Sequence, residues 1–481
     1  MKTLSLQPTR RDFLRITGTA MAAPCFLGHA PAAARPHADG QAARPNIVLV
    51  LCDDLGYGDP GCYNPQSKIP TPNIDAMAAQ GTRFTDAHCP AAICSPTRYG
   101  ILTGRNPWRG SWRRGVVKRG EGPLIEKGIP TLPQVLKSAG YRTAIVGKWH
   151  LGQVDLPPNA GVREFKAGDE RAARAAGFDD VLRLWKPDEI PTNRADLFSQ
   201  QDRLVRERTL AYLQERAQDT ERKPFFFYVN PNNPHDPYLT PEKWVGRSDV
   251  GNYGDEVMQL DAFLGDITQS LRENGMQRNT LLIFTSDNGP ETARRNYSKM
   301  PFLIPEDADD RIKLYERRER FGHDSAGGLR GSKYSAYEAG HRVPFIVSWP
   351  GTVPAGRVAT RLLAQTDLFA TCVSTAGAEM PANGAEDSVD QRVPFLGRGE
   401  DPVRRHAVFA SSKVDQVCMR RGPWTLIGPL PGKSSKRGGY ELFNTETDPA
   451  QKHDLGGRHP ERVKELRDLL AREVQRTARA E

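Results

Sequence analysis

The sequence predicts an α/β protein, in which a large domain with a mixed central sheet between helices precedes a smaller C-terminal α+β domain with an antiparallel sheet. Three observations lead to this prediction. Continuous apolar runs of strand length recur between residues 46 and 349, as is typical of strands buried on both faces. Segments with helical periodicity separate these runs. Beyond about residue 390, short apolar segments divided by turn residues replace this alternation.

Each expected strand of the large domain ends in polar or turn residues. We expect such strands over residues 46–52, 142–146, 224–229, 280–284 and 343–349. The expected helices carry apolar residues at helical spacing, and two of them are followed by a glycine, Gly81 or Gly140. They cover residues 73–80, 95–104, 132–139, 202–216 and 254–271, whereas residues 153–201 have the composition of charged, irregular chain.

The smaller domain shows short strand patterns and one amphipathic helix. The strands are expected over residues 407–410, 416–420, 424–427 and 440–443. Pro460 suits the first turn of a final helix, because proline tolerates a position whose N–H has no helical partner. We therefore divide the chain into a leader, residues 1–34, a large domain, residues 35–390, and a C-terminal domain, residues 391–481.

The leader has the pattern of a twin-arginine signal peptide. Arg10 and Arg11 precede an apolar stretch over residues 16–27, and the small residues 30–34 offer cleavage sites. The apolar stretch is too short for a permanent membrane span. A lipid anchor at Cys25 is the alternative, but Ala-Ala-Pro-Cys is a poor acylation site. We expect a bacterial protein that the twin-arginine machinery exports, so that it is periplasmic or secreted.

Charge and cysteine content set further limits. The formal net charge is +9, and the leader contributes three of these charges, which leaves about six on the mature chain. This mild basicity suits a polyanionic substrate, although it also suits simple solubility, and no nucleic-acid-binding module is present. Seven cysteines do not make a disulfide framework, although an exported chain could pair Cys372 with Cys418.

Polar side chains follow four of the expected strands, at the sheet edge where open α/β sheets bind ligands. Asp53 and Asp54 follow the first strand, and Asp287 and Asn288 follow the fourth. Adjacent carboxylates repel each other unless a cation lies between them, and oxygen donors alone favour Ca²⁺ or Mg²⁺ over Zn²⁺. If either pair, Asp53 with Asp54 or Asp287 with Asn288, is considered alone, the alternative to a cation site is a helix cap or a turn.

The segment Cys94-Ser-Pro-Thr-Arg98 has the pattern of a helix start. Ser95 suits the N-cap, Pro96 the first helical position and Gly104 the stop. Cys94 would then lie just outside a helix N-terminus, where the unpaired N–H groups favour negative charge, and Arg98 would point back to it. The alternative is that Cys94 is a small buried core residue.

This segment, followed by Leu102-Thr-Gly-Arg105, resembles the signature of the type I sulfatases of the alkaline phosphatase superfamily. The resemblance implies an alkaline-phosphatase-like fold and oxidation of Cys94 to 3-oxoalanine (formylglycine) by a formylglycine-generating enzyme. It also implies a Ca²⁺ site, with Mg²⁺ as the less expected ion. Its ligands would be Asp53, Asp54, Asp287, Asn288 and the hydrated group formed from Cys94.

The same resemblance assigns roles to basic residues at the strand ends. Arg98 and Lys148 would hold the modified residue and the sulfate oxygens, and His150 would contact the hydrated aldehyde. His235 and Lys333 would lie on the leaving-group side, where His235 protonates the departing alcohol. A hydroxyl of the hydrate would attack the sulfur, and either His150 or Asp287 would then take a proton from the second hydroxyl, which expels sulfate.

Other residues near the motifs carry weaker expectations. His323 and Asp324 precede Lys333 and could contact substrate. Thr97 replaces the commoner Ser of the family motif, and we expect this change to be harmless. Ala339 replaces the commoner Gly, and we expect a small change in packing. Cys89 should be reduced or paired with a residue other than Cys94, because a disulfide with Cys94 would block its modification.

The expected function is hydrolysis of a sulfate ester, either on a sulfated carbohydrate or polysaccharide or on an aryl sulfate. Export and mild basicity favour the carbohydrate. The alternative within catalysis is a formylglycine-dependent phosphonate or phosphodiester hydrolase, because phosphate and sulfate esters share shape and charge. The alternative from another class is a non-catalytic, polyanion-binding protein of the cell envelope.

Overall fold

The computed structural model describes residues 44–111, 115–117, 121–152, 170–184, 195–236, 238, 240–291, 321–399, 404–432 and 439–476. The described residues, which begin at Arg44, belong to one unit. The expected signal peptide, including Cys25, therefore lies outside the described residues.

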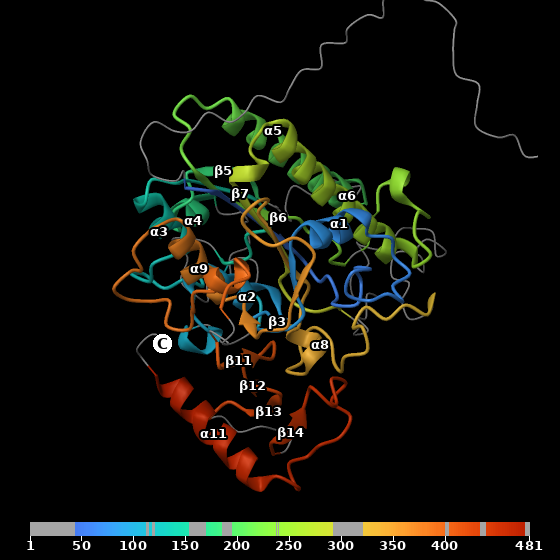
Figure 1. Cartoon of the computed structure of the whole chain (residues 1–481), viewed down its shortest axis with the longest axis vertical. Helices are drawn as coiled ribbons and strands as arrows, with labels where there is room; N and C mark the ends of the chain where they lie inside the picture. Colours follow the sequence, from blue (N-terminus) through green and yellow to red (C-terminus); the bar gives the residue numbers. More distant parts are fainter. Residues whose placement is uncertain are drawn as a thin grey trace, which may run out of the picture. The chain divides into compact units, whose positions relative to one another are not determined.

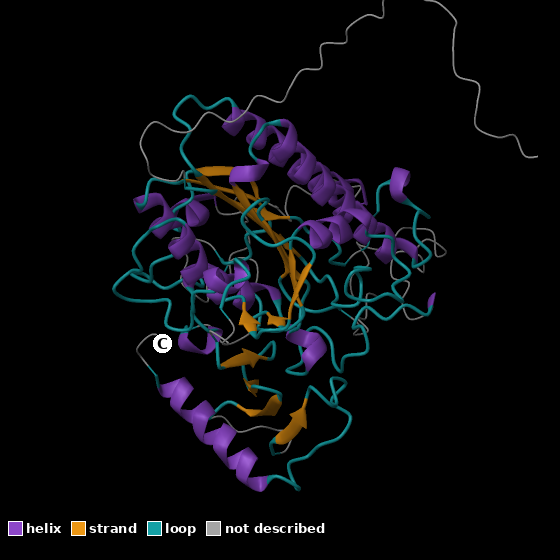
Figure 2. Ribbon diagram, viewed as in Figure 1, coloured by secondary structure: helices purple, strands orange, loops and turns teal. Residues whose placement is uncertain are grey.

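The large sheet has eight strands in the order β5-β4-β6-β1-β7-β8-β2-β9. Figures 1 and 2 show this sheet in the middle of the molecule, with helices around it. The strands are β1 (Asn46–Cys52), β2 (Thr82–Phe84), β4 (Arg142–Gly147), β5 (Asp180–Leu184), β6 (Phe225–Asn230), β7 (Thr280–Ser286), β8 (Phe345–Ser348) and β9 (Arg357–Ala359). Strand β8 runs antiparallel to both β7 and β2, and the other pairings are parallel. The prediction of a mixed α/β sheet is confirmed.

Helices cover both faces of this sheet, which explains why β1 is buried throughout. Its residues alternate between two apolar clusters, with Leu49 in one and Val50 in the other. The first cluster receives residues of α2 (Cys94–Thr103), α3 (Leu132–Ser138), α4 (Glu170–Ala175) and α9 (Asp367–Thr375). The second receives residues of α1 (Pro72–Gln80), α5 (Ala195–Ala217) and α6 (Gly251–Glu273).

Four neighbouring parallel strands, β4, β6, β1 and β7, end at the same edge of the sheet. The last residues of β4 and β6, Gly147 and Asn230, pair with each other. The last residues of β1 and β7, Cys52 and Ser286, do the same. The loops that follow these strands therefore begin side by side, and they carry the polar side chains that the sequence singles out.

A second, antiparallel sheet contains β11 (His406–Ala410), β12 (Gln416–Arg421), β13 (Trp424–Pro429) and β14 (Glu441–Asn444). Helix α11 (Pro460–Gln475) packs on it through Leu466, Leu469 and Leu470. This arrangement confirms the predicted antiparallel sheet. The domain boundary at residue 390 stays a prediction.

Several short elements lie outside the predicted set. They are β3 (Ala87–His88), which pairs with β10 (Leu363–Ala364), the strands β2, β5 and β9, and the helices α4, α8 (Glu338–His341), α9 and α10 (Arg392–Phe395). Single 3₁₀ turns cover Pro107–Arg109, Glu242–Trp244 and Gln277–Asn279. The prediction of irregular chain over residues 153–201 is wrong where α4, β5 and the start of α5 lie. None of the helices in the described part of the chain combines the length and apolar character that a bilayer span requires.

Candidate active site

Helix α2 begins at Cys94 itself, two residues before Pro96, which the N-cap pattern predicts as the first helical residue. Ile93 occupies the N-cap position without a side-chain cap, and Ser95 Oγ instead accepts a hydrogen bond from the Val117 N–H. The predicted role of Ser95 as N-cap is therefore wrong. The predicted stop is confirmed, because Gly104 has a φ of 64° and donates its N–H to Gly100 O.

The Cys94 thiol is buried among charged groups. Its Sγ lies 3.5 Å from Asp53 Oδ1, to which it donates, and 3.8 Å from Lys148 Nζ. Burial raises the pKa of this thiol well above its usual value, and the negative charges of Asp287 and Asp53 raise it further. The sulfur is therefore a neutral thiol at physiological pH.

Arg98, one turn along α2, connects the ends of three strands. Its Nε and Nη2 donate to Asp287 Oδ2 at 3.1 and 2.8 Å, and its Nη1 donates to Lys148 O and Asn230 Oδ1. The guanidinium is fully buried, which opposes its charge, but the neighbouring carboxylates raise its pKa. Asn230 is a site residue that sequence analysis did not name, although its position as the last residue of β6 is a usable signal.

Two lysines neutralise the adjacent aspartates after β1. Lys148 Nζ forms a very short ion pair with Asp53 Oδ2, and Lys333 Nζ lies 2.7 Å from Asp54 Oδ2. Burial alone would raise the pKa of Asp53, but the charges of Lys148, Arg98 and Lys333 hold it well below its usual value. Asp53 is therefore ionised across the physiological pH range.

Oxygen atoms suited to a divalent cation converge at this point. Asn288 Nδ2 donates to Asp54 Oδ1 at 2.7 Å, and Asp287 Oδ1 accepts a 3.4 Å hydrogen bond from the Asp54 N–H. Asn288 Oδ1 is buried and has no hydrogen-bond partner among the described residues. One ligand atom each from Asp53, Asp54, Cys94 and His235 lies within 4.8 Å of the others. The donor set and the unpaired amide oxygen fit a hard cation.

The two histidines of the site differ in their partners. His150 has a φ of 56°, and its buried Nδ1 has no hydrogen-bond partner among the described residues. Burial and the positive charges of Lys148 and Arg98 lower the pKa of His150 well below its usual value. His235 Nδ1 donates to Asp236 O at 2.5 Å, and its Nε2 lies 3.8 Å from Asp54 Oδ2. Burial and the charges of Lys333 and Lys148 lower the pKa of His235 as well.

The family model described as Sulfatase matches residues 45–378, which include every strand end of this site. The chain belongs to the sulfatase family. It is an enzyme that hydrolyses sulfate esters.

Known relatives of this sulfatase cover most of its length. It is 29% identical over 89% of its chain to an N-acetylgalactosamine-6-O-sulfatase from Bacteroides thetaiotaomicron, and the match covers 92% of that protein. It is 32% identical over 88% of its chain to human arylsulfatase A, with 87% of the human chain covered. A solved sulfatase structure from work on glycosaminoglycan metabolism by Bacteroides thetaiotaomicron superimposes with a TM-score of 0.75 at 28% identity, over 90% of this chain and all of the other.

His323 and Asp324 are occupied by contacts within the sulfatase itself. His323 is buried, and its Nε2 donates to Asp59 Oδ1 at 2.9 Å. The exposed carboxylate of Asp324 accepts the N–H groups of Ala326 and Gly328, which closes a turn. Their contact with substrate stays a prediction.

The six cysteines in the described part of the chain are all free. Cys89 is buried and donates to Ala91 O, in agreement with the expectation that it forms no disulfide with Cys94. Cys372 and Cys418 lie in different apolar clusters, so the disulfide that the export compartment would permit does not form.

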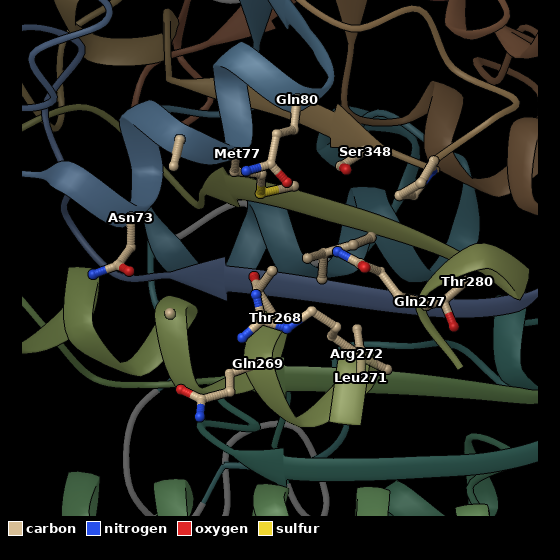
Figure 3. A pocket seen from close by; sticks show the side chains of 14 residues that line it. Asn73, Met77, Gln80, Thr268, Gln269, Leu271, Arg272, Gln277, Thr280 and Ser348 are labelled. Atoms are coloured by element: carbon tan, nitrogen blue, oxygen red, sulfur yellow. The ribbon is translucent and has the colours of Figure 1, made fainter. Parts of the chain in front are cut away.

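A separate cavity of about 210 Å³ opens between α1 and α6 of the sulfatase (Figure 3). Met77 and Gln80 line it from α1, and Thr268 and Arg272 line it from α6. Its lining contains no carboxylate, histidine or cysteine. It also includes Thr280, the first residue of β7, whereas Asp287 follows the opposite end of that strand. The cavity is therefore distinct from the Cys94 site.

Proposed function

We propose that this sulfatase desulfates a carbohydrate through a nucleophile made from Cys94, with a divalent cation bound beside it. The observation that carries the proposal is the position of Cys94, which is buried against both Asp53 and Lys148 at the start of α2. Oxidation of Cys94 to formylglycine would give a hydrated aldehyde, which supplies one hydroxyl that attacks sulfur and a second through which sulfate is expelled. An unmodified thiol has no such second hydroxyl.

The cation would be held by Asp53, Asp54, Asp287 and Asn288. An all-oxygen set favours Ca²⁺ over Zn²⁺, and the flexible coordination of Ca²⁺ suits it better than the strict octahedron of Mg²⁺. Such an ion supplies electrostatic stabilisation of negative charge. The unpaired Asn288 Oδ1 supports this assignment, because a buried amide oxygen without a partner is costly unless a ligand uses it.

Protein side chains would carry the remaining steps. Arg98, Lys148 and Lys333 would hold the charge that develops on the sulfuryl oxygens. The buried Nδ1 of His150 has no hydrogen-bond partner among the described residues, and we assign to it the acceptance of a proton from the second hydroxyl. His235 is neutral in the free enzyme, and the negative charge of a bound sulfate ester would favour its protonated form, which then protonates the leaving alcohol.

The first substrates to test are 6-O-sulfated hexosamines. Several relatives carry the name N-acetylgalactosamine-6-sulfatase, from bacterial to mammalian sources. Their names support a sulfated amino sugar as substrate more than an aryl sulfate. A panel of desulfation assays on sulfated mono- and oligosaccharides would identify the accepted position and linkage.

The nucleophile is tested by mass spectrometry of active protein made together with a formylglycine-generating enzyme. The peptide that contains residue 94 should carry 3-oxoalanine, and Cys94→Ala should abolish turnover. An unmodified Cys94 in active protein would overturn the proposal. Parallel assays with the sulfate and the phosphate ester of one phenol test the reaction class, and a higher kcat/KM on the phosphate ester would favour the phosphoryl hydrolase.

The cation is tested by chelation and replacement. Removal of divalent ions with a chelator should lower both activity and Tm, since an ion that binds only the folded state stabilises it. Ca²⁺ should restore both more effectively than Mg²⁺. In Asn288→Ala the Tm gain from Ca²⁺ should shrink, and an unchanged gain would remove Asn288 from the ligand set.

We also propose that residues 1–34 direct export through the twin-arginine pathway. The supporting observation is the sequence pattern of Arg10 and Arg11 before an apolar stretch. Replacement of both arginines by lysine should retain an uncleaved precursor in the cytoplasm. Unchanged export of that variant would refute the proposal.

A further inference from the structure

We propose that His323 is a positioning residue that fastens the segment bearing Lys333 to the segment bearing Asp53 and Asp54. The proposal rests on the function proposed above, in which Lys333 holds the sulfuryl group. His323 acts through Asp59, which lies five residues after Asp54. We call the His323–Asp59 contact, together with the other hydrogen bonds to these two side chains, the latch.

Asp59 is the buried centre of the latch. Its carboxylate accepts hydrogen bonds from His323 Nε2 at 2.9 Å and from the Gly56 N–H at 2.6 Å, and it accepts a very short one from the Tyr253 hydroxyl. Asp59 and His323 are both almost fully buried. A buried carboxylate is stable only while its donors remain in place, so the loss of His323 would leave Asp59 with an unpaired oxygen.

Both ring nitrogens of His323 form hydrogen bonds within the protein. Nε2 faces the Asp59 carboxylate and must carry the proton, because the carboxylate can only accept. Nδ1 accepts the Lys68 N–H at 3.3 Å, so it carries no proton. The ring is therefore a neutral bridge between Asp59 and the backbone at Lys68.

The backbones of the two joined segments are in direct contact around this bridge. The Gly58 N–H donates to Ser325 O at 2.8 Å, and Lys68 Nζ donates to Phe321 O at 2.7 Å. A Cβ at Gly56 would lie 2.2 Å from Ser325 O, and one at Gly58 would lie 2.4 Å from Asp324 O. No side chain fits between these two segments, so their backbones lie in direct contact beside the latch.

The same two segments meet again at the reactive end. Lys333 Nζ lies 2.7 Å from Asp54 Oδ2, with both side chains buried. The two segments are therefore joined at two places, by the latch at one end and by the Lys333–Asp54 ion pair at the other. Without the latch, residues 321–333 lose their side-chain tie to the Asp54 segment, and we expect the Lys333 ammonium to be held less precisely.

The test compares two substitutions of His323 with a matched control. His323→Ala removes the latch, whereas His323→Gln retains an N–H donor of similar reach toward Asp59. We expect kcat/KM to fall at least about tenfold in His323→Ala and to recover by half or more in His323→Gln. His453→Ala, in which the replaced side chain is 79% exposed, should leave kcat/KM unchanged.

A double-mutant cycle separates positioning from a loss of stability alone. If His323 acts through Lys333, His323→Ala should cost no further activity in the Lys333→Ala background, although it should still lower Tm. Wild-type kcat/KM in His323→Ala would overturn the proposal. Fully multiplicative losses in the double variant, or no rescue by His323→Gln, would overturn it as well.

Hydrogen–deuterium exchange tests the latch independently of turnover. In His323→Ala the amides of residues 53–68 and 321–333 should exchange faster together, and in His323→Gln they should exchange as in the wild type. Unchanged exchange in His323→Ala would overturn the latch. Hydrogen–deuterium exchange is measured without substrate. A failure of the proposed chemistry at Cys94 would therefore leave the exchange result unchanged, so the two failures can be told apart.

Discussion

Arg98 shows how much of the site depends on one side chain. Its planar guanidinium makes four hydrogen bonds in a fully buried position, to Asp287, Lys148 O and Asn230. A lysine at this position keeps the positive charge but loses the fork geometry, so it cannot reach all of these acceptors at once. The acceptors left unpaired would be buried with no water to replace the lost donors.

We therefore expect Arg98→Lys to lower kcat/KM by about 100-fold or more and to destabilise the fold by about 3–5 kcal/mol. Steady-state kinetics and urea unfolding measure the two effects. Arg421→Lys is the matched control, since Arg421 is 49% exposed and pairs with Glu465 on the surface. The control should stay within about 0.5 kcal/mol of wild type. A stable, active Arg98→Lys enzyme would contradict this account of Arg98.

Glu256, which is not one of the proposed catalytic residues, should make the stability of the fold depend on pH. Burial and the nearby charge of Asp202 raise its pKa to about 8. Between the unfolded value of about 4.5 and pH 8, the folded chain keeps a proton that the unfolded chain has lost, so stability falls as pH rises.

The glutamine side chain in Glu256→Gln cannot titrate, so the variant should lose the part of the fall in stability with pH that Glu256 contributes. The variant should gain roughly 2 kcal/mol or more relative to wild type between about pH 5 and pH 8, because a tenfold change in a proton-binding constant corresponds to about 1.4 kcal/mol. Urea unfolding at several pH values measures the difference. Glu207→Gln, at a position that is 47% exposed, should show the wild-type slope. Parallel slopes in all three proteins would refute the assignment.

At this scale the sequence could name the site residues but not their partners. Asp53, Asp54, Cys94 and Lys333 are identifiable because they stand in motifs or follow apolar strands. The pairing of Lys148 with Asp53 and of Lys333 with Asp54 depends on how distant loops meet. The sequence singles out His323 for its place near Lys333, and only the fold shows that both of its nitrogens bind within the protein.

At the scale of elements, the ends of β4 and β6 fix the position of Lys148. Gly147 has a φ of 90°, which favours glycine, and a Cβ there would lie 1.9 Å from Asn230 O. Lys148 follows directly and donates its N–H to the same Asn230 O. Any side chain at position 147 would therefore push β4 away from β6 and move Lys148 with it.

Gly147→Ala should destabilise the fold by at least about 2 kcal/mol more than Gly275→Ala. Gly275 is a matched control, since it has a φ of 68° but a Cβ added there would meet no atom within 4 Å, so it isolates the cost of the backbone conformation. Gly147→Ala should also lower kcat/KM, and Gly275→Ala should not. Equal losses of stability in the two variants would show that the close contact with Asn230 is unimportant.

The major elements follow from local sequence, and the short ones do not. Strand β1 and helix α6 have apolar patterns that are long enough to identify without tertiary information. Strands β2 and β9 have three residues each, and their pairing at the sheet edge depends on partners distant in sequence. The N-cap pattern places the start of α2 two residues late, because Ser95 uses its hydroxyl for a tertiary contact instead of a cap.

For the whole molecule, the C-terminal sheet supports the catalytic loops. The Ala410 N–H donates to Pro90 O and the Ala92 N–H to Ala410 O, which ties β11 to the segment just before Cys94. The Ser412 N–H donates to Tyr334 O, and the Tyr334 N–H donates to Ala92 O. The loop that contains Lys333 and the loop before Cys94 are therefore bonded both to each other and to the second sheet.

A chain truncated after residue 390 should consequently have no sulfatase activity. Loss of the C-terminal sheet would remove the hydrogen bonds to Pro90, Ala92 and Tyr334. It would also expose apolar residues that pack on β11, so we expect an unfolded or aggregated product. Circular dichroism, size-exclusion chromatography and turnover measure the outcome. Truncation after Arg476 is the control, since it keeps all of α11 and should leave activity unchanged. An active, monomeric chain of residues 35–390 would show that the catalytic loops hold their positions without the second sheet.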